Sequence, residues 1–123
     1  MSDQDLFNFV LLKITQQGEP SYEDDKCLYR MIKSDGTVLK CGAGQLIPDE
    51  VYDPSMEGKA AFVISYFQLN LRKQIHLISD MQSAHDRAAR NCLNFEDKPF
   101  IELFNDYMKE VAKNYDLKLK ETA

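Results

Sequence analysis

The hydrophobic residues near the N-terminus recur every three or four positions, which is typical of an α-helix with one buried face. Ser2 or Asp3 can cap the start of this helix, because a short polar side chain accepts a hydrogen bond from the first turn. Gly18 predicts its end as a left-handed cap residue, and Pro20 as a helix breaker. The apolar stripe consists of Leu6, Phe7, Val10, Leu11 and Ile14.

A β-hairpin is predicted next. The segments "CLYRMI" (27–32) and "TVLKC" (37–41) flank "KSDG", in which Gly36 can take a positive φ without steric cost. A three-residue loop places Met31 opposite Leu39, whereas a two-residue loop would place it opposite a lysine. The first register buries more apolar surface, so we expect it, with Gly36 in a G1 bulge. One face then carries Cys27, Tyr29, Met31, Leu39 and Cys41.

The middle of the chain contains shorter helical signals. "GAGQLI" predicts a helical turn, which must end at an extended Ile47 because Pro48 follows. "YDPSME" predicts a helix start, with Asp53 as N-cap and Pro54 at the first helical position. Residues 60–70 are apolar almost all round, which fits a buried helix or a buried strand, although the alanines and the preceding cap favour a helix.

Two further helices are predicted from Leu71 to about Asn91 and from Pro99 to about Tyr115. Their apolar stripes are Leu71, Ile75, Ile78, Met81, Ala84, Ala88 and Cys92 in the first, and Phe100, Leu103, Phe104, Tyr107, Met108, Val111 and Tyr115 in the second. A lone hairpin is marginal in water, so its apolar face must be covered by helices. We therefore expect an α+β fold, mostly α, with about four helices packed on one two-stranded β-hairpin.

Length and composition predict a single domain, 1–123. The chain has 123 residues, of which 44% are hydrophobic and 28% charged, as in globular rather than disordered proteins. No apolar run reaches the length of a membrane span, and the N-terminus is acidic where a signal peptide would be basic. We expect a cytoplasmic protein whose three cysteines are reduced thiols.

The net charge is −5, which argues against nucleic acid as a partner because phosphate binding needs a basic patch. We expect neither a nucleic-acid nor a membrane partner. An acidic surface can meet a basic partner, but more often it only keeps a protein soluble.

Three cysteines and one histidine are candidate ligands of a zinc site. Cys27 and Cys41 face inward from the predicted hairpin, while His85 and Cys92 lie two helical turns apart on one face. These ligand types suit tetrahedral Zn²⁺, but no two of them show the close spacing of structural zinc sites. Cysteine is often buried for packing alone, so we predict no metal and no cofactor.

A catalytic interpretation would set Cys41 beside His85, with Asp86 orienting the imidazole. Adjacent helical residues point about 100° apart, so we expect His85 and Asp86 not to pair. The common nucleophile, phosphate-loop and zinc-protease motifs do not occur in the sequence. The sequence therefore favours a binding protein over an enzyme.

An acid-rich segment follows the hairpin, with Asp49, Glu50, Asp53 and Glu57. Four acids could hold a hard cation, but calcium-loop spacing does not occur there and Asp53 has a capping role. Arg30 lies on the hairpin face opposite the cysteines. We expect it to pair with one of these acids; an anionic ligand is the alternative.

The segments "CLYR", "DGTVLKCGAGQLIPDEVYDPSMEGK" and "MQSAHD" together resemble a family of small, largely uncharacterised bacteriophage and bacterial proteins. Position 42 is Gly where the family pattern has Ala, and Cys92 has no counterpart. The resemblance implies a phage-type protein in the cytoplasm of a host cell, but no activity. The matching positions are Cys27, Tyr29, Arg30, Asp35, Gly36, Cys41, Gly44, Leu46 to Glu50, Tyr52, Met56 to Lys59, Gln82, His85 and Asp86.

Polar and aromatic residues within this match are the candidate site. We expect them to form a polar network that clasps the acid-rich segment to the hairpin and to the helix of His85, with a ligand pocket as the alternative. The set consists of Tyr29, Arg30, Asp49, Glu50, Tyr52, Glu57, His85 and Asp86.

Three functions remain open. We expect an accessory protein that acts by binding, and that inhibits or sequesters a host protein. The first alternative is a small-molecule or nucleotide binder in which Arg30, Tyr29 and Tyr52 hold an anionic ring-bearing ligand; the second is a small enzyme using Cys41 or His85. An oligomer is also conceivable, since the apolar "FVISYF" fits a core or a subunit interface.

Overall fold

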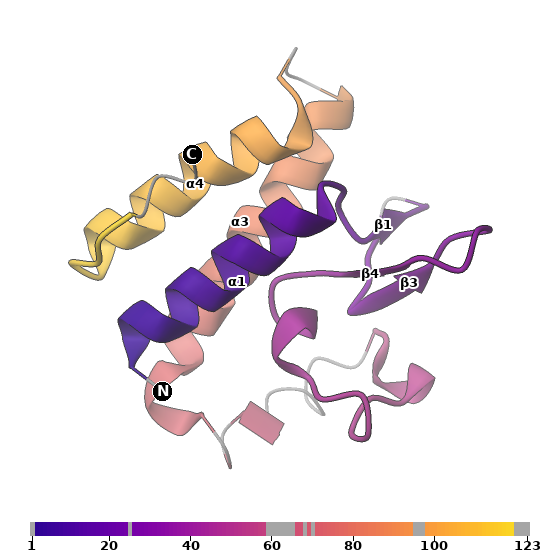
Figure 1. Cartoon of the computed structure of the whole chain (residues 1–123), viewed down its shortest axis with the longest axis horizontal. Coiled ribbons are helices and arrows are strands. Elements are labelled where there is room, and N and C mark those ends of the chain that lie inside the picture. Colours follow the sequence, from indigo (N-terminus) through magenta and orange to yellow (C-terminus); the bar gives the residue numbers. More distant parts are fainter. Residues whose placement is uncertain are drawn as a thin grey trace.

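The computed structural model describes residues 2–24, 26–58, 66–67, 69, 71–94 and 98–119, without the side chains of residues 93 and 94. Within these residues the chain is mostly helical, with three α-helices and two small antiparallel sheets. Figure 1 shows the three helices side by side, with the strands grouped beside α1 and α3. The expected α+β class, mostly α, is confirmed.

Helix α1 spans Asp3–Gln17 and has the predicted ends. The Ser2 hydroxyl accepts a hydrogen bond from the backbone N–H of Asp5 at 3.0 Å, which caps the first turn. Gly18 adopts a φ of +77°, and its N–H donates to the carbonyl of Ile14 at 3.0 Å. All five residues of the predicted apolar stripe are buried, so the period of the sequence identified the buried face correctly.

The two C-terminal helices are also confirmed. A short 3₁₀ turn, η3 (Arg72–Gln74), leads into α3 (Ile75–Asn94), and α4 spans Phe100–Asn114. Leu77 and Ala89 are buried although they lie outside the predicted stripe of α3. The reason is that α3 packs against both α1 and α4, so it needs a wider apolar face than a helix with one neighbour.

The second sheet has the register expected of the hairpin. Strands β3 (Arg30–Ile32) and β4 (Val38–Lys40) are antiparallel, with Met31 opposite Leu39. The N–H of Lys33 donates to the carbonyl of Thr37 at 2.8 Å, which closes a three-residue loop, and Gly36 has a φ of +89°. The glycine supplies the positive φ that this loop requires.

The prediction of one hairpin is wrong, because a separate sheet precedes it. Strands β1 (Tyr22–Glu23) and β2 (Lys26–Cys27) pair with each other, and Cys27 therefore belongs to a different sheet from Met31. The expected strand over 27–32 is interrupted at Leu28 and Tyr29. Their N–H groups are taken by the carbonyl of Ser21 and by the side chain of Glu57. A side chain thus replaces a strand partner at this point.

About four helices were expected, and the described residues contain three. Asp53 does cap a helical start, accepting from the N–H of Ser55 at 2.8 Å. However, η2 (Pro54–Met56) is a single 3₁₀ turn, because Glu57 is extended and Gly58 has a φ of +75°. The prediction for residues 60–70 falls mostly outside the described residues; Tyr66, Phe67 and Leu69, which are described, are helical.

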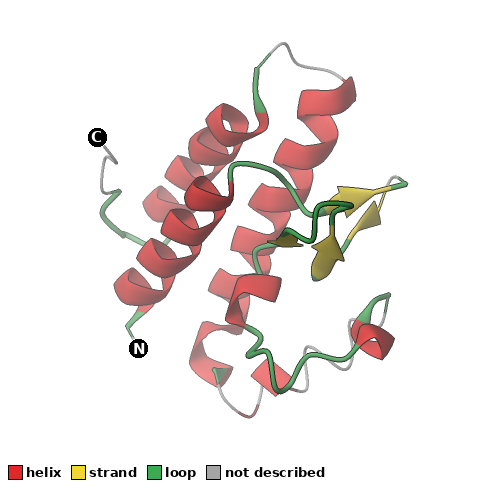
Figure 2. Cartoon of the chain, turned by 45° about the vertical axis from the view of Figure 1, so that its right-hand side comes forward, coloured by secondary structure: helices red, strands yellow, loops and turns green. Residues whose placement is uncertain are grey.

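The core fills the space between the helices and the loop that follows β4. Each helix contributes its apolar face, and residues 39–56 add Leu39, Cys41, Ala43, Ile47 and Met56. The 3₁₀ turn η1 (Gly44–Leu46), predicted from the sequence, brings this loop against α1. Figure 2 shows the strands on the side of α1 and α3 that faces away from α4. None of the described helices is long and apolar enough to cross a membrane.

Candidate functional site

The carboxylate of Glu57 is the centre of the first polar network. Its Oε1 accepts the backbone N–H of Tyr29 at 2.8 Å, and its Oε2 accepts that of Arg30 at 3.0 Å. The hydroxyl of Tyr52 also donates to Oε2, at 2.7 Å. Burial and this hydrogen bond raise the pKa of Tyr52 to about 12. One carboxylate therefore fixes the start of β3 and the loop after η1.

Arg30 completes this network from the other side. Its Nη2 donates to the carbonyl of Ile47 at 2.9 Å and pairs with Asp49 Oδ1 at 2.7 Å. The guanidinium also lies 4.5 Å from the ring centroid of Tyr52. The expected internal ion pair is thus present, and Arg30 itself covers one face of the Tyr52 ring. Lys40 and Arg30 together hold the pKa of Asp49 below its usual value.

His85 and Asp86 form the second network. His85 is fully buried, its Nε2 accepts the backbone N–H of Ser21 at 3.1 Å, and its Nδ1 lies 2.9 Å from Asp86 Oδ1. The expectation that adjacent residues would not meet is wrong. The angle of about 100° separates the directions in which the side chains leave the helix, and does not limit where their ends lie. Because a neutral imidazole has only one accepting nitrogen, Nδ1 carries the proton and donates to Asp86.

Asp86 also connects α3 to the strands and to η1. Its Oδ1 accepts Gln82 Nε2 at 2.9 Å, and Gln82 Oε1 in turn accepts the N–H of Ala43 at 2.6 Å. The thiol of Cys27 is a third donor to this carboxylate. Burial, and then this hydrogen bond, raise the pKa of Cys27 above its usual value, so the sulfur keeps its proton.

Among the described residues, one cluster could hold a metal ion: Cys27, His85 and Asp86, whose ligand atoms lie within 4.8 Å of one another. The hydrogen bonds argue against zinc here. A metal ion binds to an imidazole nitrogen through its lone pair. The lone pair of His85 Nε2 accepts the N–H of Ser21, and Nδ1 carries the proton, so neither nitrogen has a lone pair to offer. Binding would require the imidazole to lose its one N–H proton, on Nδ1, or to give up the hydrogen bond from Ser21.

The other sulfur ligands of the imagined zinc site lie elsewhere. Cys41 is buried and its sulfur accepts the N–H of Gly44 at 3.3 Å, while the thiol of Cys92 donates to the carbonyl of Ala89 at 3.3 Å. All three cysteines are free thiols. Burial raises the pKa of Cys41 to about 12, so this thiol is not poised as a nucleophile.

The structure therefore divides the predicted eight-residue set into two networks. Tyr29, Arg30, Asp49, Tyr52 and Glu57 meet around the loop after η1, whereas His85 and Asp86 meet on α3. Glu50 is exposed and has no polar contact within the described residues. The sequence reasoning missed Ser21 and gave no role to Gln82, although Gln82 belongs to the residues that carry the resemblance.

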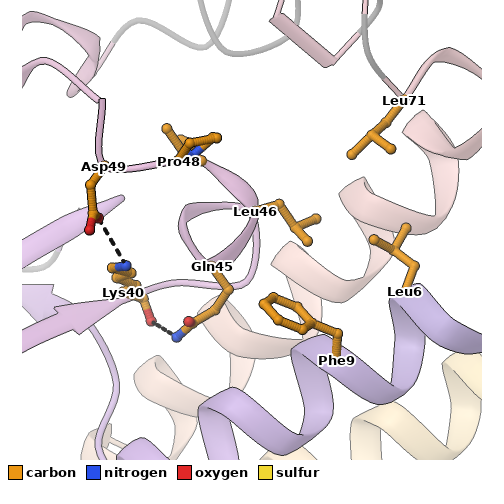
Figure 3. A pocket seen from close by; sticks show the side chains of 9 residues that line it. Leu6, Phe9, Lys40, Gln45, Leu46, Pro48, Asp49 and Leu71 are labelled. Carbon is orange, nitrogen blue, oxygen red and sulfur yellow. Dashed lines mark hydrogen bonds and ion pairs between the residues drawn. The ribbon is translucent and has the colours of Figure 1, made fainter. Parts of the chain in front are cut away.

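A separate groove opens between α1 and the loop after β4. Its volume is about 400 Å³, and Figure 3 shows the side chains of Leu6, Phe9, Leu46 and Leu71 directed toward it. Ile47 and Pro48 also line it, and Lys40, Gln45 and Asp49 form a polar rim. The sequence did not predict this groove, because its walls come from three separate segments of the chain.

Comparison of the chain with family models, with curated proteins and with solved structures finds no match.

Proposed function

We propose that the protein acts by binding another protein. The observation that carries this proposal is the outer end of the β3–β4 sheet. Ile32 and Val38 lie opposite each other there, with 72% and 45% of their surfaces exposed. Large apolar residues exposed as an adjacent pair are typical of an interaction surface rather than of a solvated hairpin.

The backbone edges of this sheet are covered at its inner end. The side-chain amide of Gln17 pairs with the backbone of Lys40 in both directions, donating to its carbonyl and accepting its N–H, each at 2.9 Å. On the opposite edge, Glu57 accepts the N–H of Arg30. Both side chains act as substitute strand partners and prevent pairing with another chain at these positions.

The same edges are open at the outer end. Lys33 and Thr37 form a hydrogen-bonded pair, so by the alternation of antiparallel ladders the N–H and C=O of Ile32 and Val38 point away from the sheet. Within the described residues no group forms a hydrogen bond with them. An extended segment of a partner protein fits these groups, because its backbone can pair with the open edge while its apolar side chains cover Ile32 or Val38.

The resemblance to phage and bacterial proteins supports a partner from a host cell, and the role is part of our proposal. The partner is a host protein, and the accessory protein inhibits or sequesters it in the host cytoplasm. The two alternatives need groups that are already engaged within the protein. Arg30, which would bind an anionic ligand, is paired with Asp49 and stacked on Tyr52. His85, which would serve an enzyme, has both ring nitrogens in hydrogen bonds.

A crosslinking experiment in bacterial cells tests this function. A photoreactive amino acid at Ser34, in the exposed turn, should give one adduct whose partner mass spectrometry identifies. The purified partner should then bind Ile32→Pro at least about tenfold more weakly than wild type, because proline removes an outward N–H without breaking a ladder bond. Leu12→Ser, which changes an exposed apolar residue of α1, is the matched control and should bind normally. Unchanged affinity of Ile32→Pro would exclude strand addition at the β3 edge.

A further inference from the structure

The groove between α1 and η1 has the character of a small-molecule site. Four apolar side chains face it from both walls, and its volume of about 400 Å³ lies in the range of ligand pockets. Phe9 and Leu46 are only partly buried, so apolar surface remains open to an occupant. Burying that surface would favour binding of an apolar body.

The polar rim indicates what the other end of the occupant should carry. The ammonium group of Lys40 has three donors, and within the described residues its one charged contact is to Asp49 Oδ1, at 3.5 Å. That oxygen is already held at 2.7 Å by Arg30. Lys40 is thus a cation beside an apolar groove with little of its hydrogen-bonding capacity used.

We infer that this groove binds a small amphiphilic carboxylate, with its apolar body against Phe9 and Leu46 and its carboxylate on Lys40. Lys40 favours an anionic head, and the charge of Asp49, which also lines the groove, is already paired with Arg30 at 2.7 Å. Asp49 does not prevent this arrangement: its side chain is 81% exposed, and its stronger contact is with Arg30. A carboxylate head therefore replaces only the long contact between Asp49 and Lys40.

Decanoate, below its micelle concentration, is a suitable probe. Titration of the 123-residue chain, followed by amide chemical shifts and calorimetry, should show one saturable site with the largest shifts at residues 6–9 and 45–49. Lys40→Met keeps the apolar stem of the side chain and removes its charge, so it should weaken decanoate binding at least about tenfold. Decanol has the same body without the charge, and Lys40→Met should bind it as wild type does.

Leu46→Gln tests the contacts of the ligand's apolar body independently of its charged head. It should weaken decanoate and decanol alike, whereas Leu12→Ser on the exposed side of α1 should change neither. Thermal unfolding of each variant without ligand verifies that it is folded. Two results would overturn the inference: no saturable decanoate binding to wild type, or decanoate binding that Lys40→Met leaves unchanged. The strand-addition surface shares no residue with this groove, so either proposal can fail alone.

Discussion

At the scale of single residues, carboxylates on loops and helices serve as partners for backbone and side-chain donors. Glu57 accepts two consecutive backbone N–H groups and a tyrosine hydroxyl. Asp86 accepts from an imidazole, an amide and a thiol. A partly buried donor without an acceptor is costly, so Glu57 determines where β3 begins, while Asp86 holds side chains of α3 in place.

Glu57→Gln tests this role directly. Glutamine has the same shape but only one accepting oxygen, and its NH₂ group would face a backbone N–H. We expect the free energy of unfolding to fall by about 2 kcal/mol in urea denaturation. Glu50→Gln, in the same segment but exposed, is the matched control and should change stability little. Equal stability of the two variants would contradict the role assigned to Glu57.

The tautomer of His85 can be measured as well. Because Ser21 donates to Nε2, the neutral ring should carry its proton on Nδ1. Long-range nitrogen–proton NMR correlations of the imidazole distinguish the two tautomers. The spectrum should not change when Zn²⁺ is added, since no lone pair is available on Nδ1. A proton on Nε2, or a zinc-dependent shift, would instead favour a metal site with Cys27 and Asp86.

At the scale of elements, short two-stranded sheets are stabilised by what surrounds them. Neither edge of the β3–β4 sheet pairs with a further described strand; Gln17 from α1 covers one edge at Lys40, and Glu57 covers the other at Arg30. Isolated hairpins are marginal in water, so such contacts and the burial of Leu39 hold this one in place.

Gln17→Ala removes the side-chain partner of Lys40. We expect the amide of Lys40 to exchange its hydrogen at least about tenfold faster, because its acceptor is lost. Gln16→Ala changes the neighbouring, exposed glutamine and should leave that exchange rate unaltered. If both variants exchange like wild type, Gln17 does not protect the edge.

At the scale of the whole molecule, the loop after β4 packs directly on the segment before β3. A Cβ atom at Gly44 would overlap the backbone carbonyl of Tyr29, whereas one at Gly36 would meet no atom within 4 Å. Gly44 therefore allows a close approach between two backbones. Gly36 is needed only because its turn requires a positive φ.

Substitution of the two glycines should show this difference. Gly44→Ala forces the two segments apart, so we expect a loss of about 3 kcal/mol in the free energy of unfolding. Gly36→Ala strains only its own turn, and we expect a loss of about 1 kcal/mol. Urea denaturation measures both. A smaller loss for Gly44→Ala than for Gly36→Ala would mean that the loop moves freely.

Stability should also fall in alkali. Burial and a hydrogen bond to a carboxylate raise the pKa of Tyr52 and of Tyr115 to about 12; the hydroxyl of Tyr115 lies 2.6 Å from Asp80. A pKa that is higher in the folded state favours the folded state fully below the ordinary value of 10.0, and this contribution is lost as the pH rises toward 12. The free energy of unfolding should decrease over that range, and less steeply in Tyr52→Phe. An equal slope in the variant would contradict the assignment.

The sequence by itself determined the local features. It placed α1 and α4, the Ser2 and Asp53 caps, and the turn at Gly36, because helix period, capping and turn chemistry depend on neighbours within about four residues. It also favoured pairing of Arg30 with the acid-rich segment, since a charge needs a partner.

Tertiary structure alone decided the rest. The break between β2 and β3 depends on Glu57, and the protonation of His85 depends on Ser21, which lies 64 positions away in the chain. The groove exists because α1, η1 and Leu71 leave a space between them. No local pattern encodes these contacts, because each depends on how distant segments pack, and packing is settled only when the whole core forms.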